Sequence, residues 1–129
     1  MLNIILVGVG GAIGSICRYL ISSKLAIWVG SHFPWPIIMI NMIGCFLAGG
    51  LGRYLSMQPV IPSFVSIHAF LIIGFLGGFT TFSSFSLDFL SLYSRGLIGQ
   101  SLLYVGLSLF LSLSAAFLGV LIVEYCCRG

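Results

Sequence analysis

Residues 74–86 read GFLGGFTTFSSFS, a run of glycines, threonines and serines inside a segment that is otherwise apolar. The surrounding segment, residues 64–92, is longer than the ~20 residues that an α-helix needs to cross a bilayer. Gly77 and Gly78 each lower helix stability by about 1 kcal/mol relative to alanine, and the threonines that follow compete for backbone hydrogen bonds. The stretch predicts a membrane-spanning helix that is broken near its middle, where freed carbonyls can coordinate a cation. A glycine kink that only fits a neighbouring helix is the alternative.

Outward from this stretch, the composition is that of an integral membrane protein. The chain has 129 residues, of which 60% are hydrophobic and only 5% are charged. A soluble domain has about a quarter of its residues charged, so this chain cannot cover a surface that faces water. We expect an all-α, multi-pass protein with one membrane domain at residues 1–129. Its four predicted spans are at about residues 3–23, 35–55, 64–92 and 98–123.

The basic residues are divided evenly between the two sides of the membrane. With four spans, Arg53 and Arg128 fall on one side and Lys24 and Arg95 on the other, while Arg18 lies within the first span near the second side. An excess on one side normally sets the orientation. Five basic residues are few, so the balance can arise without consequence. It can also mean that the chain inserts in both orientations, and we predict an antiparallel, dual-topology homodimer. Small residues four apart in the first two spans suit close helix packing, within one chain or between subunits.

Polar and aromatic side chains from three spans are expected at a similar depth in the membrane. Phe82 and Phe85 lie three residues apart and hence on one helical face, with Ser83 between them. Because the edge of an aromatic ring is positive, two rings presented edge-on can accompany a small anion. Asn41 in the second span is costly in lipid unless it has a partner, so we expect it to face the same path. Hydroxyl groups recur at every fourth residue of the fourth span, at Tyr104, Ser108 and Ser112.

The remaining charged residues and the cysteines are expected to be structural. Ions inside a membrane usually pair, so the sequence predicts an Arg18–Asp88 contact. Glu124 is expected near Arg128, at the end of the fourth span. Cysteines within spans, such as Cys45, are expected to behave as small apolar residues. Two acids and two histidines cannot supply a base, a nucleophile and a carboxylate together, so we expect no enzymatic activity.

Three features of the sequence together resemble one known family. GGFTTFSSFS at residues 77–86, GGAIGSICRY at residues 10–19 and an asparagine early in the second span are similar to the Fluc (CrcB) family of bacterial fluoride channels. The similarity covers the whole chain in length, span number and motif order. It implies an antiparallel homodimer with two fluoride pores, surrounded by lipid in the bacterial inner membrane, with no nucleic-acid partner. It also implies a structural sodium ion at the dimer centre, held by the backbone carbonyls of Gly77 and Thr80.

The resemblance further implies roles for individual residues and a passive mechanism. The pore phenylalanines match Phe82 and Phe85, the pore amide matches Asn41, and the first-span arginine matches Arg18, which would concentrate anions at a vestibule. The assignment of the fourth-span serines rests on their spacing rather than on a motif. Hydrogen fluoride would enter the cell as a neutral weak acid and ionise there. Fluoride would then leave through the channel down its electrochemical gradient.

Two other classes of protein are alternatives to a channel. A proton-coupled small multidrug exporter also has four short spans and an antiparallel dimer. It needs a membrane-embedded carboxylate, which the first span lacks. A non-conducting accessory subunit would use its polar residues only to contact a partner. Such a subunit would not need two phenylalanines and a line of hydroxyls to converge.

Overall fold

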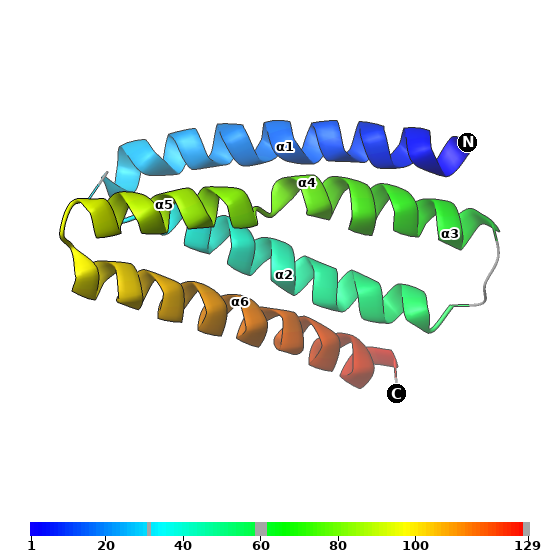
Figure 1. Cartoon of the computed structure of the whole chain (residues 1–129). Helices are drawn as coiled ribbons and strands as arrows, with labels where there is room; N and C mark the ends of the chain where they lie inside the picture. Colours follow the sequence, from blue (N-terminus) through cyan, green and yellow to red (C-terminus); the bar gives the residue numbers. More distant parts are fainter. Residues whose placement is uncertain (31, 59–61, 128–129) are drawn as a thin grey trace.

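The fold is helical wherever the structure is described. This computed structural model describes residues 1–30, 32–58 and 62–127, and every regular element in these ranges is a helix (Figure 1). Four helical segments are long and apolar enough to cross a membrane: Leu2–Val29, Trp35–Ser56, Ser63–Ser94 and Ile98–Cys127. The chain is therefore an all-helical, multi-pass membrane protein, as its composition predicts.

Glycine and proline set the boundary between the first two helices. Helix α1 (Leu2–Val29) continues past its predicted end because residues 24–29 contain neither glycine nor proline. It ends at Gly30, whose φ of 79° is one that residues with a side chain rarely adopt. Helix α2 (Trp35–Ser56) has Pro36 in its first turn, where a backbone N–H is not needed. The loop between the two helices thus follows from the residues at its ends.

The third span consists of four consecutive helical elements and a two-residue link. The helical elements are α3 (Pro62–His68), the π-helix η1 (Ala69–Leu76), α4 (Gly77–Phe79) and α5 (Phe82–Ser94). Thr80 and Thr81 form the link between α4 and α5, with extended backbone at ψ 157° and 122° respectively. Gly77 and Gly78, which are expected to weaken the helix, are themselves helical, so the extended residues come after them. The fourth span, α6 (Ile98–Cys127), is one continuous helix.

Neighbouring spans run in opposite directions, so the N-terminus and the end of α6 lie at the same end of the bundle (Figure 1). Helix α1 packs along η1 and α4, whereas α2 packs along α6. Helix α5 contacts both α2 and α6. Helix α2 thus borders both halves of the third span, whereas α1 contacts the half before the extended link and α6 the half after it.

Glycines on both sides allow α1 to approach the third span with backbone against backbone. A methyl group added at Gly10 would lie 2.9 Å from the backbone nitrogen of Phe75, and one at Gly14 would collide with the Phe75 carbonyl oxygen. From the other side, a methyl group at Gly78 would collide with the carbonyl oxygen of Gly11. The first-span glycines therefore pack within the chain, which was one of the two roles that their spacing predicts.

A second close approach joins α2 and α6. A methyl group at Gly49 would collide with the carbonyl oxygen of Ala116, and one at Gly119 would collide with that of Phe46. Gly44 and Gly52 belong to the other set of small residues spaced four apart on this span: a methyl group at Gly44 would collide with Thr80, whereas one at Gly52 would have no atom within 4 Å. Close packing within the chain therefore uses Gly44 and Gly49 but not Gly52.

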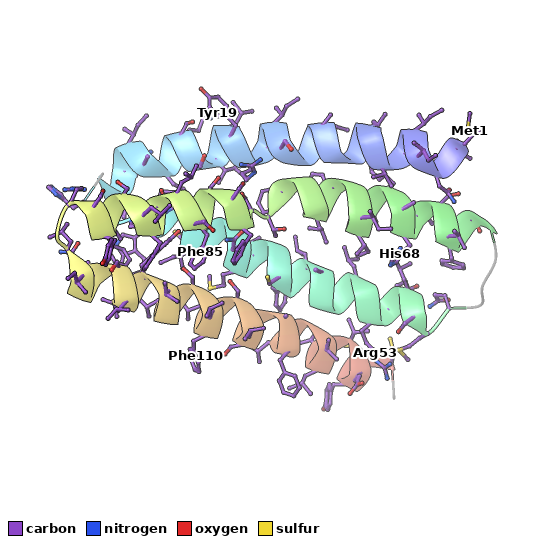
Figure 2. The ribbon with its side chains drawn as sticks, viewed as in Figure 1. Met1, Tyr19, Arg53, His68, Phe85 and Phe110 are labelled. Carbon is purple, nitrogen blue, oxygen red and sulfur yellow. The ribbon has the colours of Figure 1, made fainter. Side chains whose placement is uncertain are left out.

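The buried core lies beside α5, and the outside of the bundle is apolar. Ile38, Leu92 and Tyr104 form a buried cluster that joins α2, α5 and α6. Away from this cluster large apolar side chains face outward, and Phe110 on α6 is 71% exposed and points away from the bundle (Figure 2). Such a surface suits lipid or a second subunit rather than water.

Candidate functional site

Asn41 holds the extended link through both atoms of its side-chain amide. Its Oδ1 accepts a hydrogen bond from the Thr81 backbone N–H at 2.8 Å, and its Nδ2 donates to the Thr81 carbonyl oxygen at 3.0 Å. Backbone groups inside a membrane need protein partners, and an extended residue cannot find them within its own helix. The partner that this intramembrane amide requires is therefore the backbone of Thr81.

The side chain of Thr81 begins helix α5. Its Oγ1 accepts a hydrogen bond from the Ser84 backbone N–H at 3.1 Å, which is the geometry of a helix N-cap. The same oxygen lies 3.1 Å from Ser83 Oγ and 3.2 Å from Ser84 Oγ. The hydroxyl groups at the start of α5 thus form one small network around the cap, and Ser83 belongs to this network.

Arg18 contacts the other side of the interruption. Its Nε donates a hydrogen bond to the Gly78 carbonyl oxygen at 3.1 Å, and Ser15 Oγ donates to the same oxygen at 3.4 Å. The carbonyls at the end of a helical segment carry partial negative charge, which a guanidinium group stabilises. Arg18 can reach this carbonyl because the glycines allow α1 and α4 to approach closely.

The predicted Arg18–Asp88 contact is wrong, whereas the predicted Glu124–Arg128 contact involves a residue outside the described ranges. The Asp88 carboxylate accepts a hydrogen bond from the Tyr104 hydroxyl at 3.2 Å, rather than pairing with Arg18. Within residues 1–30, 32–58 and 62–127, the ion pair is that of Arg53 with Glu124, at 2.9 Å. Arg128, the predicted neighbour of Glu124, lies outside the described residues. Asp88 and Arg18 do not meet because Asp88 faces α6, whereas Arg18 is bound at the end of α4.

A cavity of about 240 Å³ lies beside the extended link, between α2, α5 and α6. Ten residues line it: Asn41, Cys45, Thr80, Thr81, Phe82, Phe85, Ser108, Leu109, Ser112 and Leu113. Five of the residues predicted to form an anion path are therefore brought together here. Tyr104 and Ser83 are adjacent to the cavity lining without belonging to it. None of the ten lining residues is charged.

The two phenylalanines lie side by side at one wall of this cavity. The ring centroids of Phe82 and Phe85 are 5.3 Å apart with an angle of 41° between the ring planes. Phe85 lies on the side of α5 that faces α6 (Figure 2), and its ring is 5.2 Å from that of Tyr104. Phe82 is 76% exposed on the single chain. One ring is thus held inside the bundle while the other extends the wall beyond it.

The hydroxyl groups on α6 differ in whether they already have a hydrogen-bond partner. Tyr104 is fully buried and donates its hydroxyl to Asp88. Ser108 is 5% exposed, and its Oγ has no hydrogen-bond partner among the described residues although it lines the cavity. A buried hydroxyl normally has a partner, so the unpartnered Ser108 hydroxyl is a candidate donor for a ligand in this cavity.

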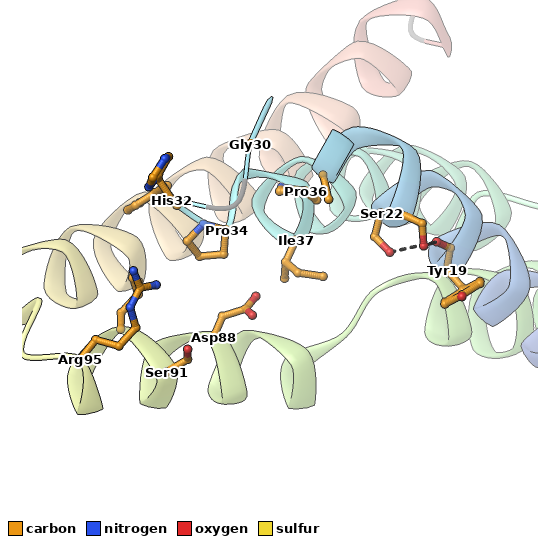
Figure 3. A pocket seen from close by; sticks show the side chains of 14 residues that line it. Tyr19, Ser22, Gly30, His32, Pro34, Pro36, Ile37, Asp88, Ser91 and Arg95 are labelled. Carbon is orange, nitrogen blue, oxygen red and sulfur yellow. Dashed lines mark hydrogen bonds between the residues drawn. The ribbon is translucent and has the colours of Figure 1, made fainter. Parts of the chain in front are cut away.

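A second cavity lies at the end of the bundle that holds the α1–α2 loop. It has a volume of about 360 Å³ and includes Asp88 and Ser91 from α5, Arg95 directly after this helix, and His32 from the loop (Figure 3). Asp88 links the two cavities, because it lines this one and binds Tyr104, which packs against Phe85 in the other. Asp88, Tyr104 and Phe85 therefore form a continuous series of contacts from the cavity near the α1–α2 loop to the phenylalanine wall of the cavity beside the extended link.

Thr81, Leu109 and Leu113 line the cavity without being among the predicted site residues, and two further participants are also not predicted from the sequence. One is Cys45, which is treated as an apolar residue although it lies four residues after Asn41 and hence on the same face of α2. The other is the Gly78 carbonyl, the acceptor for Arg18. The four-residue spacing could have indicated Cys45, whereas a backbone acceptor leaves no signal in the sequence.

Comparison with known proteins places the chain in a family. The family model described as CrcB-like protein, Camphor Resistance (CrcB), matches residues 5–120. A relative from Agrobacterium fabrum (strain C58) is 44% identical over 120 residues, which cover 93% of this chain and 94% of the relative. A relative from Rhodospirillum centenum is 41% identical over 127 residues, which cover 96% and 97% respectively. Both relatives are named Fluoride-specific ion channel FluC, a channel rather than an enzyme. The chain belongs to the CrcB family, the family that its third-span motif resembles.

Proposed function

We propose that the chain is a fluoride-selective ion channel that exports cytoplasmic fluoride by passive electrodiffusion and so lowers fluoride toxicity. The observation that carries the proposal is the cavity beside the extended link, which Ser108, Phe82 and Phe85 line together and in which Ser108 Oγ has no hydrogen-bond partner among the described residues. Curated relatives at 37% to 44% identity that are named fluoride-specific channels support the choice of ion.

The lining of the cavity suits a small, strongly hydrated anion. Fluoride gives up water when it enters a narrow path, so donors on the wall must replace that water. The hydroxyl groups of Ser108 and Ser112 are two such donors. Asn41 offers a third, because an amide NH₂ has two hydrogens and Thr81 takes one of them. The aromatic edges add weak positive potential, and with no lysine or arginine in the lining the anion is not trapped.

Arg18 is proposed to act at the entrance rather than inside the cavity. It does not belong to the cavity lining, and it binds the Gly78 carbonyl through Nε. A guanidinium group has further N–H groups, and its positive charge attracts anions from the surrounding water. Arg18 would thus raise the local concentration of fluoride while it stabilises the end of α4.

We further propose a structural sodium ion held by the carbonyls of Gly77 and Thr80. In a continuous α-helix the Thr81 N–H would bind the Gly77 carbonyl and the Ser84 N–H would bind the Thr80 carbonyl. Here Thr81 N–H donates to Asn41 Oδ1 and Ser84 N–H donates to Thr81 Oγ1. Both carbonyls are therefore deprived of their usual donors, and carbonyl oxygens are suitable ligands for a hard cation. The bound ion would hold the interrupted helix in place.

The proposed assembly is an antiparallel, dual-topology homodimer in the lipid of the bacterial inner membrane. The even division of Lys and Arg between the two sides supports insertion in both orientations. The exposed ring of Phe82 supports the presence of a second subunit. If the edge of this ring contacts fluoride, the ring must be shielded from lipid tails, and a partner chain can provide that shield. A partner related by two-fold symmetry would bring a second copy of the same wall.

Fluoride and chloride efflux from liposomes tests the proposal. The purified chain is reconstituted, and both ions are followed with ion-selective electrodes under one potential. Fluoride should leave and chloride should be retained, and the double substitution Phe82→Ile with Phe85→Ile should abolish fluoride efflux. Phe110→Ile is the matched control, because this ring is exposed and lies outside the cavity lining. Equal efflux of the two anions, or normal efflux through the double variant, would reject the proposal.

A further inference from the structure

Cys45 places a thiol in the wall of the candidate fluoride path. It lies one helical turn after Asn41 on α2, so both side chains face the same side of this helix. That side borders the cavity, whose lining also includes the two α6 serines, Ser108 and Ser112. A thiol is chemically unlike the hydroxyl, amide and aromatic groups around it, because it binds soft metal ions as well as protons.

The backbone of α2 is fixed on both sides of Cys45. At Gly44, a methyl group would collide with Cγ2 of Thr80 in the extended link. At Gly49, a methyl group would collide with the Ala116 carbonyl oxygen on α6. If α2 rotated about its axis, its backbone would collide with Thr80 and with the Ala116 carbonyl. The thiol is therefore kept on the side of α2 that faces the cavity.

Ser108 gives an independent sign that this cavity binds a ligand. Its Oγ is buried at 5% residue exposure and has no partner among the described residues. The other cysteines lack this setting. Cys17 lines neither of the cavities described above. Cys126 and Cys127 border an apolar groove between the ends of α2 and α6. Cys45 is thus the cysteine that shares a cavity with a free hydroxyl.

We propose that Cys45 makes this cavity a binding site for thiophilic metal cations, and that their binding closes the path to fluoride. This inference rests on the proposed function. With Ag⁺ the sulfur–hydrogen bond breaks, the sulfur–silver bond forms and the proton passes to water, so no electrons are transferred. Serine oxygens on α6 border the same space. The bound metal and its sulfur narrow the cavity; because the thiolate neutralises the charge of Ag⁺, the path is closed by the bulk of the metal rather than by added charge.

Fluoride efflux with and without silver nitrate tests this inference. The triple variant Cys17→Ala, Cys126→Ala, Cys127→Ala keeps Cys45 as its one cysteine, and the matched control adds Cys45→Ser. Nitrate replaces chloride in all buffers because silver chloride is insoluble. Silver should slow efflux through the Cys45-containing variant by about tenfold or more, since the thiolate is a strong ligand for soft metals. An added small thiol should restore the rate. Each variant is compared with its own untreated rate, and the control should be unaffected.

A count of bound silver separates this inference from the proposed function. After removal of free metal, the Cys45-containing variant should retain about one silver ion per chain and the control none, as expected for one thiolate ligand. Silver retention that is equal in the two variants, or efflux that silver slows equally in both, would overturn the inference. If the untreated protein carries no fluoride, the proposed function fails, and the silver count alone still decides whether Cys45 binds the metal.

Discussion

Replacing Asn41 should destabilise the link between α4 and α5 more than any other single polar substitution in the cavity. Asn41→Ala removes the partners of two Thr81 backbone groups, the N–H at 2.8 Å and the carbonyl at 3.0 Å. An unsatisfied buried group costs about 1–3 kcal/mol, so the variant should lose about 2–6 kcal/mol of stability. Asn41→Asp keeps an acceptor for the Thr81 N–H but loses the donor. Because its charge is also costly in the membrane, it should be impaired as well.

Thermal stability in detergent and fluoride efflux in liposomes measure this effect together. The midpoint of thermal unfolding should fall strongly for Asn41→Ala, and fluoride efflux should be lost because the cavity wall is no longer held. Asn3→Ala is the matched control: Asn3 is also an amide on a helix, but it is exposed and accepts one hydrogen bond from Ser66. An Asn41→Ala protein as stable as this control would refute the assigned role of the amide.

Three further predictions concern packing, the free hydroxyl and the ion pair. Gly14→Ala should cost about 1–3 kcal/mol, because its methyl group collides with a backbone carbonyl, whereas Gly106→Ala, with no atom within 4 Å, should raise the unfolding midpoint slightly. Ser108→Ala should slow fluoride efflux by about ten- to hundredfold, the value of a lost hydrogen bond to a charged ligand, and leave the unfolding midpoint unchanged. Arg53→Ala should change stability by about 1 kcal/mol or less, because its ion pair is partly exposed. For this last variant, a large fall in the unfolding midpoint would contradict the prediction.

The sequence predicts what depends on composition and on spacing along one helix. Charge scarcity and long apolar runs give four spans, and the three-residue spacing of Phe82 and Phe85 places their rings together. The four-residue spacing of Ser108 and Ser112 places both in one cavity. In each case the relevant geometry is local, because helix periodicity alone decides which side chains share a face.

What the sequence does not predict depends on how one helix is rotated against another. Counting residues along the spans predicts that Arg18 and Asp88 pair, yet Arg18 binds the Gly78 carbonyl and Asp88 binds Tyr104. Two side chains at the same depth in the membrane meet only if their helices also turn these side chains toward each other. Tyr104 belongs to the predicted hydroxyl line, but its hydroxyl is already donated to Asp88 rather than left for an anion.

The π-helical segment η1 sets the rotational phase of everything that follows it in the third span. Each of its turns takes in more residues than an α-helical turn does, so later side chains point in directions that an α-helix of the same length would not give. Deleting one residue within 69–76 would turn the following helix relative to its present orientation, by somewhat less than the ~100° that one residue contributes in an α-helix. The aromatic pair would then swing away from α6. The number of residues in η1, which does not line the cavity, is therefore as important for placing Phe82 and Phe85 as the identity of these two residues.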